Sequence, residues 1–228
     1  MFEKVFRKVF RIVYVLKKSQ PYSKRNKVFC IGANKTGTTS MKEIFRTLEI
    51  PVGSQLIGEM LVSDVVNKNY YEFIKYVKYG GVGFQDLPFS LPEVFKILDK
   101  KFPESKFILT LRDSPEVWYN SLINFHAKVF GNGKLPTKSD LQNNKYVYKG
   151  WAWEINRLLF DTPEDDLYNK EILIQSYINY NNSVIEYFKS QPEKLLVINL
   201  KEPDAAKKIS QFLDSEIALK EIPWENKT

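Results

Sequence analysis

Residues 32–40, Gly-Ala-Asn-Lys-Thr-Gly-Thr-Thr-Ser, follow a short apolar run and precede a helix-like segment. A strand, a glycine-containing turn and a helix start place backbone N–H groups and the positive end of the helix dipole around one point, which predicts an anion site. Gly32 and Gly37 have the spacing of the nucleotide-binding P-loop, but Thr38 stands where that pattern has its lysine. The lysine has moved to Lys35. The alternative is an ordinary strand-to-helix turn with a threonine as the helix cap.

An arginine follows the clearest strand candidate of the chain. Residues 106–111, Lys-Phe-Ile-Leu-Thr-Leu, end at Arg112. A phosphoryl-transferring P-loop enzyme needs a carboxylate near such a position to hold magnesium, whereas a guanidinium suits an anion. Ser114 is a favourable N-cap and Pro115 a favourable first residue for the helix that follows. These residues indicate a second anion-binding element, and the alternative is a surface arginine that ends a strand.

Residues 35–39, Lys-Thr-Gly-Thr-Thr, resemble the phosphosulfate-binding loop of sulfotransferases, which binds the donor PAPS (3′-phosphoadenosine 5′-phosphosulfate). The resemblance implies that Lys35 bonds the oxygen that bridges sulfur and phosphorus and neutralises the leaving phosphate. Sulfuryl transfer requires no metal, and it needs donors aimed where negative charge develops. The resemblance implies that the donor is held by Lys35, Thr36, Gly37, Thr38, Thr39, Ser40, Arg112 and Ser121.

Arg112 and Ser121 resemble the family's 3′-phosphate motif, in which an arginine precedes a proline and a helix that carries a serine on its second turn. The step from Arg112 to Ser121 is one residue longer than in the family, but the step from Pro115 to Ser121 matches it. The extra residue is therefore expected in the turn before the helix, which keeps Ser121 in its helical phase. Asn120 is the alternative to Ser121, and a plain helix hydroxyl is the alternative without the resemblance.

Asp86 lies in the segment Gly-Phe-Gln-Asp-Leu-Pro of residues 83–88. Ligand sites of parallel sheets form beyond the carboxyl ends of the strands, so we expect Lys35, Asp86 and Arg112 to converge. In cytosolic sulfotransferases a Thr-His-Leu-Pro segment holds the general base, and the resemblance implies that Asp86 takes this role if desolvation raises its pKa. Alternatively, Asp86 caps the turn or binds a lysine. His126, the only histidine of the chain, is expected at the surface and not as the base.

These candidate residues need a scaffold that brings strand ends together. Short apolar runs predict strands at 28–32, 82–85, 106–111 and 194–199. Helices are predicted at 39–48, 54–78 (a pair), 91–102, 115–130, 151–160, 167–189 and 204–213. The alternation predicts an α/β fold with a P-loop-type doubly wound, mainly parallel sheet of four to five strands and helices on both faces. Residues 131–150 lack a period and are predicted to form a mobile loop or lid.

The two ends of the chain complete the predicted organisation. Residues 194–228 are similar to the closing strand, helix and Pro-x-x-Asn tail of bacterial-type sulfotransferases, so the predicted domain is 28–228. Residues 1–27 carry nine basic residues against Glu3 alone, and since the whole chain has a net charge of +7, the predicted domain is close to neutral. It therefore offers no basic face for nucleic acid.

Apolar residues within residues 2–18 recur at helical spacing with Lys and Arg opposite them, which predicts a basic amphipathic helix followed by a linker. The segment is too charged to span a bilayer. It either lies on an anionic membrane surface or packs on the domain or a partner. Because the segment lacks a cleavage site for secretion and Cys30 is the single cysteine, a cytoplasmic location is expected, with the cytoplasmic membrane face as the alternative.

The sequence thus predicts a PAPS-dependent, metal-independent sulfotransferase with Lys35 and Asp86 as catalytic residues. A small-molecule or glycan acceptor is expected, in particular a carbohydrate or glycolipid hydroxyl. The competing hypotheses are a P-loop kinase or ATPase, and a catalytically inactive membrane-surface scaffold with a nucleotide fold. The sequence assigns neither the identity of the acceptor nor an oligomeric state.

Overall fold

The computed structural model describes residues 22–223. The amphipathic helix predicted for residues 2–18 lies outside this range, so its association with a membrane or with protein stays a prediction. Within the described range, no helix combines the length and the apolar character needed to cross a membrane.

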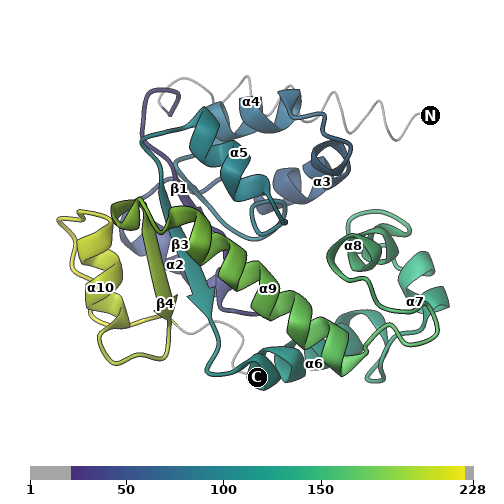
Figure 1. Ribbon diagram of the computed structural model, residues 1–228. Helices are drawn as coiled ribbons and strands as arrows, with labels where there is room; N and C mark the ends of the chain where they lie inside the picture. Colours follow the sequence, from purple (N-terminus) through teal and green to yellow (C-terminus); the bar gives the residue numbers. More distant parts are fainter. Residues whose placement is uncertain (1–21, 224–228) are drawn as a thin grey trace.

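Four strands of the described residues form a parallel sheet at the centre of the molecule (Figure 1). They are β1 (Val28–Cys30), β2 (Gly83–Phe84), β3 (Lys106–Leu111) and β4 (Leu195–Asn199). The order is β2-β1-β3-β4, and every neighbouring pair is parallel. The strand before the Lys35 loop therefore lies between the strand before Asp86 and the strand before Arg112. The predicted α/β fold with a parallel sheet is confirmed.

Helices cover both faces of this sheet. One face carries α2 (Thr38–Thr47) and α10 (Ala205–Phe212). The opposite face carries α3 (Gln55–Val66), α4 (Tyr71–Gly80), α5 (Val94–Lys101) and α9 (Lys170–Phe188). Three further helices lie beside one end of α9 in Figure 1, namely α6 (Pro115–Phe130), α7 (Lys138–Asn143) and α8 (Trp151–Leu159). A short 3₁₀ helix, η1 (Pro192–Lys194), leads into β4.

Each face of the sheet has its own hydrophobic core, because successive side chains of a strand point to opposite faces. Phe29 of β1 and Phe107 of β3 face the larger core, with ring centroids 5.4 Å apart. Cys30 and Ile108 face the smaller core, which α2 and α10 close. Cys30 is fully buried, as predicted, and burial raises the pKa of its thiol to about 12. The apolar strand runs are thus explained by burial on both faces.

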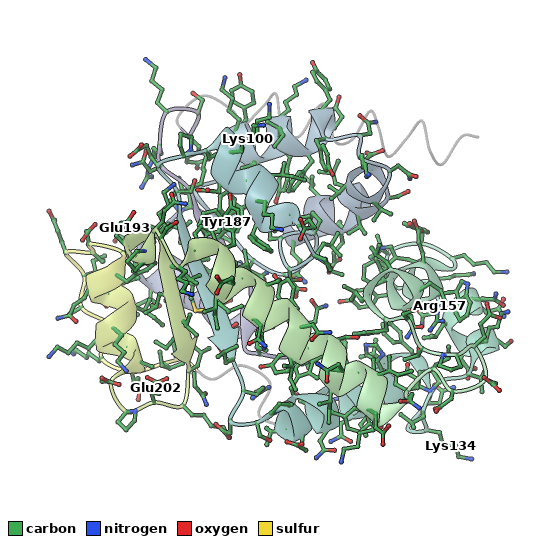
Figure 2. The ribbon with its side chains drawn as sticks, in the orientation of Figure 1. Lys100, Lys134, Arg157, Tyr187, Glu193 and Glu202 are labelled. Atoms are coloured by element: carbon green, nitrogen blue, oxygen red, sulfur yellow. The ribbon has the colours of Figure 1, made fainter. Side chains whose placement is uncertain are left out.

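Charged side chains inside the domain tie elements to one another. The carboxylate of Asp99 in α5 accepts hydrogen bonds from the Lys194 ammonium at 2.8 Å and from the Tyr187 hydroxyl at 3.0 Å. Tyr187 lies on α9 (Figure 2) and Lys194 on η1, so this contact joins α5, α9 and the start of β4.

Lys27 is part of the packed domain. Its side chain is 2% exposed, and its ammonium donates to the carbonyl oxygens of Tyr22, Lys78 and Gly81 at 2.6, 3.2 and 2.9 Å. Burial, with a smaller effect of Arg25, lowers the pKa of Lys27 to about 8. Although Lys27 counts with the basic N-terminal residues, it therefore serves to hold the chain before β1 against the end of α4.

The prediction of a loop throughout residues 131–150 is wrong. Helix α7 lies inside this segment and begins with a capping box, in which Thr137 and Asp140 exchange hydrogen bonds. Leu141 of this helix is fully buried. The helix is too short to show an apolar period, but its Thr-x-x-Asp start is a recognisable capping signal. Movement of the segment as a lid stays a prediction.

Candidate active site

The loop between β1 and α2 depends on both of its glycines. A Cβ at Gly32 would lie 2.0 Å from the Thr110 hydroxyl oxygen of β3, so only glycine permits this approach. Gly37 has a φ of 104° and is itself the N-cap of α2, with no side-chain cap. The alternative of a threonine cap is therefore wrong. The start of α2 presents backbone N–H groups that no side chain caps, as an anion site requires.

Lys35 is held in an unusual backbone conformation at the tip of this loop. Its φ of 73° is left-handed, which costs a residue with a side chain about 1–3 kcal/mol. The Lys35 carbonyl oxygen accepts a hydrogen bond from Nε of Arg112, which fixes the peptide. The ammonium lies 3.9 Å from the centroid of the Phe125 ring and forms no ion pair within residues 22–223. Burial, then the charge of Arg112, lowers the pKa of Lys35, and Asp86 opposes this shift.

Arg112 follows β3 and reaches both the loop and α6. Its Nη2 donates to Oγ of Ser121 at 3.3 Å, and Ser121 is 7% exposed. Asn120, the alternative, is exposed and forms no described bond to Arg112. The neighbouring Asp113 turns away, because its carboxylate accepts from Asn199 and Lys201, each at 2.6 Å. The guanidinium thus stays beside the loop without a carboxylate of its own.

Helix α6 holds Ser121 in this position through local signals at its start. The hydroxyl of Ser114 caps the helix by accepting from the backbone N–H of Val117 at 3.2 Å, and Pro115 is the first helical residue. Trp118 anchors the first turn, because its Nε1 donates to the Asn34 carbonyl oxygen at 2.9 Å and its ring stacks on Tyr177 at 4.5 Å. With its start fixed in this way, α6 directs Ser121 of its second turn toward Arg112.

Asp86 follows β2 and joins the loop from its other side. One carboxylate oxygen accepts from the backbone N–H of Leu87 at 2.9 Å, so the residue does cap its own turn. The other oxygen accepts from the Thr38 hydroxyl at 3.2 Å and from Nε2 of Gln55 at 3.4 Å. Asp86, like Lys35, has a left-handed φ, here 66°. Desolvation by burial raises the pKa of Asp86, which is the direction that a general base near neutral pH requires.

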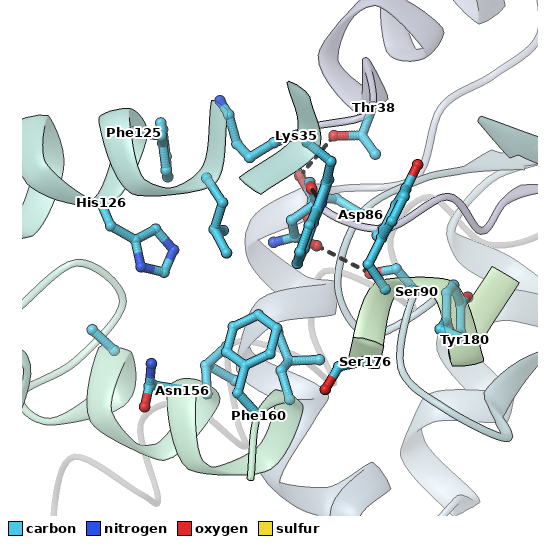
Figure 3. Close-up of a pocket in the computed structure, with 18 of the residues that line it drawn as sticks. Lys35, Thr38, Asp86, Ser90, Phe125, His126, Asn156, Phe160, Ser176 and Tyr180 are labelled. Carbon is cyan, nitrogen blue, oxygen red and sulfur yellow. Dashed lines mark hydrogen bonds between the residues drawn. The ribbon is translucent and has the colours of Figure 1, made fainter. Parts of the chain in front are cut away.

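These groups border one cavity of about 340 Å³ (Figure 3). Its loop end is formed by Lys35, Gly37, Thr38, Thr39 and Arg112, with Asp86 beside them. Its helix end is formed by residues of α6 and α8 and by the residue after α8, namely Leu122, Phe125, His126, Phe130, Trp151, Ala152, Ile155, Asn156, Leu159 and Phe160. The expected convergence of Lys35, Asp86 and Arg112 at the carboxyl edge of the sheet is what the structure has.

Two further polar residues of the cavity were not among the sequence candidates. Gln55 of α3 donates to Glu59 at 2.9 Å and also reaches Asp86, so it bridges the two carboxyl groups. Glu59 is 8% exposed, and burial, with the nearby charge of Asp86, raises its pKa to about 7. A glutamate four residues after a glutamine on a largely apolar helix is the signal that could have pointed to this pair.

The expectation of a surface position for His126 is wrong. The imidazole borders the cavity, and its Nδ1 lies 3.0 Å from the hydroxyl oxygen of Tyr168. Desolvation by burial, with the charge of Lys35, lowers the pKa of His126 to about 3, so the ring is neutral. Because α6 turns its His126 face toward α8, only the packing of the two helices decides this placement.

A family model described as "Sulfotransferase domain" matches residues 27–228. The chain belongs to the sulfotransferase family. The search of curated proteins found no match.

The predicted donor-binding residues of this sulfotransferase occupy different positions relative to the cavity. Lys35, Gly37, Thr38, Thr39 and Arg112 border it, and Ser121 contacts Arg112 from behind. The side chains of Thr36 and Ser40 are each 2% exposed and do not line it. The Thr36 hydroxyl instead donates to the Ala33 carbonyl oxygen at 2.7 Å and lies 2.6 Å from Oγ1 of Thr110. Thr36 therefore shapes the loop through its side chain and has only its backbone to offer a ligand.

Proposed function

We propose that this sulfotransferase moves the sulfuryl group of PAPS to an acceptor hydroxyl without a metal ion. The observation that carries the proposal is the convergence, at one cavity, of the Lys35 ammonium, the uncapped start of α2, the Arg112 guanidinium and the carboxylate of Asp86. The two anionic parts of PAPS, the phosphosulfate and the 3′-phosphate, need the first three groups. An acceptor hydroxyl needs the last.

The loop end of the cavity suits the two anionic parts of PAPS. The N–H groups at the start of α2 and the Lys35 ammonium would hold the phosphosulfate, because both place positive charge around one point. Arg112, with Ser121 behind it, would hold the 3′-phosphate, since a guanidinium binds phosphate through paired N–H donors. Arg112 is already held by the Lys35 carbonyl oxygen, so the two binding elements are coupled through one hydrogen bond.

PAPS, when bound, supplies a sulfuryl group whose bond to a phosphate oxygen breaks while a bond between sulfur and the acceptor oxygen forms. Lys35 would stabilise the negative charge that collects on the phosphate oxygen. Asp86 would accept the proton that the acceptor hydroxyl loses, so that charge and atoms balance. Thr38 and Gln55 would orient the receiving carboxylate, because both donate to the same oxygen of Asp86.

The acceptor class and the location in the cell are two further parts of the proposal. The acceptor is a small molecule or glycan with a free hydroxyl, and the expectation of a carbohydrate or glycolipid is taken up in the next subsection. A cytoplasmic location, with residues 2–18 on an anionic membrane surface as one arrangement, also stays a proposal.

Calorimetric titration tests the nucleotide directly. We expect adenosine 3′,5′-bisphosphate to bind with micromolar affinity in the presence of a metal chelator, and ATP with magnesium to bind at least about 100-fold more weakly, a difference of about 2.7 kcal/mol. Tighter binding of ATP, together with metal-dependent ATP hydrolysis, would instead support the P-loop kinase or ATPase. Binding of neither nucleotide would support the inactive scaffold.

A further inference from the structure

The helix end of the cavity is mostly apolar. Its side chains from α6 and α8, with the residue after α8, are largely aliphatic or aromatic: Leu122, Phe125, Phe130, Trp151, Ala152, Ile155, Leu159 and Phe160. The few polar groups here are already engaged or neutral. His126 uses Nδ1 toward the Tyr168 hydroxyl, and the Ser176 hydroxyl donates to the Ile172 carbonyl oxygen at 2.8 Å. A ligand at this end therefore meets mainly carbon.

Tyr146 also brings a hydroxyl to the cavity, but Asn156 is the polar side chain of this wall that is almost fully buried. Its side chain is 2% exposed, and the amide nitrogen Nδ2 has no hydrogen-bond partner among the described residues. Figure 3 shows this nitrogen on the side of Asn156 that faces His126, and both residues border the cavity. A buried N–H donor without an acceptor costs about 1–3 kcal/mol. A ligand oxygen that accepts from this nitrogen would remove that cost.

The orientation of the Asn156 amide is set by its neighbour. The amide oxygen accepts from Nε of Arg157 at 3.0 Å and from Nη2 at 2.6 Å. Arg157, labelled in Figure 2, also donates to the hydroxyl of Thr162 at 2.6 Å. Because a guanidinium can only donate, the oxygen of Asn156 must face Arg157 and the nitrogen must face the cavity. The two hydrogen bonds from Arg157 to the amide oxygen thus fix the direction of the Asn156 N–H donor.

We propose that the helix end is the acceptor subsite and that it takes a compact aromatic or apolar alcohol that carries one further oxygen acceptor, which the Asn156 amide donates to. The proposal rests on the proposed function, since it places the acceptor hydroxyl at Asp86 and the body of the molecule between α6 and α8. It narrows the expectation of a carbohydrate. A sugar would bring several hydroxyl groups against Phe125, Phe130 and Leu159, and each unpaired hydroxyl would cost about 1–3 kcal/mol.

The size of the cavity agrees with a small acceptor. Its volume of about 340 Å³ includes the space beside Lys35 that the sulfuryl end of the donor needs. Sites for drug-sized ligands span about 300–1,000 Å³, so this one lies at the lower limit. Glu59, whose pKa is raised to about 7, adds little charge to the wall below neutral pH. A single aromatic ring with one substituent fits these properties better than an oligosaccharide does.

A panel of acceptors tests the subsite. The probes are 4-ethylphenol, 3-hydroxyacetophenone, 4-hydroxyacetophenone and methyl β-D-glucopyranoside. For each probe, kcat/KM is measured with PAPS, and the dissociation constant is measured in the presence of adenosine 3′,5′-bisphosphate, where no transfer occurs. We expect kcat/KM for the phenols to exceed that for the glucoside by at least about 100-fold. We also expect kcat/KM for one of the two hydroxyacetophenones to exceed that for 4-ethylphenol by about tenfold, the value of one hydrogen bond.

Asn156→Asp keeps the oxygen that Arg157 needs and removes the N–H donor. We expect it to abolish the preference for the ketone while 4-ethylphenol is affected less. Asn156→Ser removes the amide without adding charge and serves the same purpose if the first variant does not fold. Asn143→Asp, exposed on α7, is the matched control and keeps the wild-type preference.

The outcomes distinguish failure of the proposed function from failure of the proposed acceptor subsite alone. If adenosine 3′,5′-bisphosphate does not bind and no probe is sulfated, the proposed function fails and the subsite fails with it. If the nucleotide binds but the glucoside is the better acceptor, only the subsite is overturned. The same holds if both Asn156 variants keep the preference for the ketone.

Discussion

The two ends of the cavity are built in opposite ways. The loop end takes most of its groups from a continuous stretch, residues 32–40, and its donors include backbone N–H groups that any sequence would carry. The helix end takes its side chains from α6 and α8, which are separated by residues 131–150. The loop end is charged, and the helix end is mostly apolar with one directed amide.

This difference explains why one end can be recognised from a motif and the other cannot. Binding a phosphosulfate needs a fixed arrangement of donors, which a short loop supplies because its own backbone determines the geometry. Holding an apolar molecule needs only shape and exclusion of water, which many combinations of side chains provide. The following predictions test whether the ends act separately, in order of decreasing effect.

Lys35→Ala removes the cation of the loop end. Because an ammonium aimed at developing charge contributes about 10²–10³-fold to turnover, we expect kcat to fall by about 1,000-fold, or 4 kcal/mol, with little change in thermal stability. Initial rates at saturating PAPS measure the effect. Lys100→Ala, exposed on α5 (Figure 2), is the control and keeps full activity. Wild-type turnover in Lys35→Ala would remove Lys35 from catalysis.

Glu59→Gln changes the wall between the two ends. Burial raises the pKa of folded Glu59 from 4.5 to about 7, whereas the unfolded chain ionises near 4.5. Between these values the folded state binds more protons than the unfolded state, so Glu59 makes the free energy of unfolding fall as pH rises through this window. We expect Glu59→Gln to be more stable than wild type by about 3 kcal/mol at pH 8 and equally stable at pH 4.5.

Thermal melting of both proteins at these two pH values measures the difference. Glu186→Gln, on the exposed side of α9, is the control for the substitution itself. An equal stability gain at both pH values would show that the effect is not one of ionisation.

Asp86→Asn tests the junction of the two ends. We expect kcat to fall by about 100-fold and the affinity for adenosine 3′,5′-bisphosphate to stay unchanged, because only proton acceptance is lost. In wild type, kcat should rise with pH as the carboxyl group, whose pKa is raised by burial, loses its proton. This limb of the profile disappears in Asp86→Asn if Asp86 is the base. A variant that keeps the limb points to another group.

Ser121→Ala tests the alignment of the 3′-phosphate motif and has the smallest expected effect. Loss of one hydroxyl beside Arg112 should weaken adenosine 3′,5′-bisphosphate by about fivefold, or 1 kcal/mol, and leave adenosine 5′-phosphosulfate unaffected, because the latter lacks the 3′-phosphate. Asn120→Ala is the matched control and should bind both nucleotides like wild type. The reverse result would mean that Asn120 holds the 3′-phosphate and that the alignment based on the step from Pro115 to Ser121 is wrong.

Local sequence signals predicted the bounds of a strand or helix well where they marked the whole element. The strand at residues 106–111 and the helix at residues 115–130 agree with β3 and α6, because an apolar run and a Ser-Pro cap specify them without help from distant residues. Helix α7 was missed because its stability depends on a capping box and one buried side chain, Leu141, and not on a period.

The candidate site was predictable only in part. Lys35, Arg112 and Asp86 follow three neighbouring parallel strands, so topology alone brings them together. The packing of α6, α3 and α8 decides three other features of the site. It places His126 at the cavity, brings Gln55 to Asp86 and turns the amide oxygen of Asn156 toward Arg157. No pattern within a single helix specifies that packing. The apolar residues of α3 and α6 are spread around the helix, and the single apolar face of α8 does not specify which helix it packs against.

The sequence by itself determined the parallel sheet and the turn between β1 and α2, since both follow from short-range rules of backbone geometry and side-chain alternation. The family followed from the resemblance of residues 35–39 to the loop motif of sulfotransferases. The tertiary structure alone decided which side chains of the helices face the cavity. It buried Thr36 behind the loop, gave Glu59 and Asp86 their raised pKa values and directed Asn156 toward the site. Burial and desolvation depend on neighbours that are distant in the chain, and these neighbours meet only when the domain has folded.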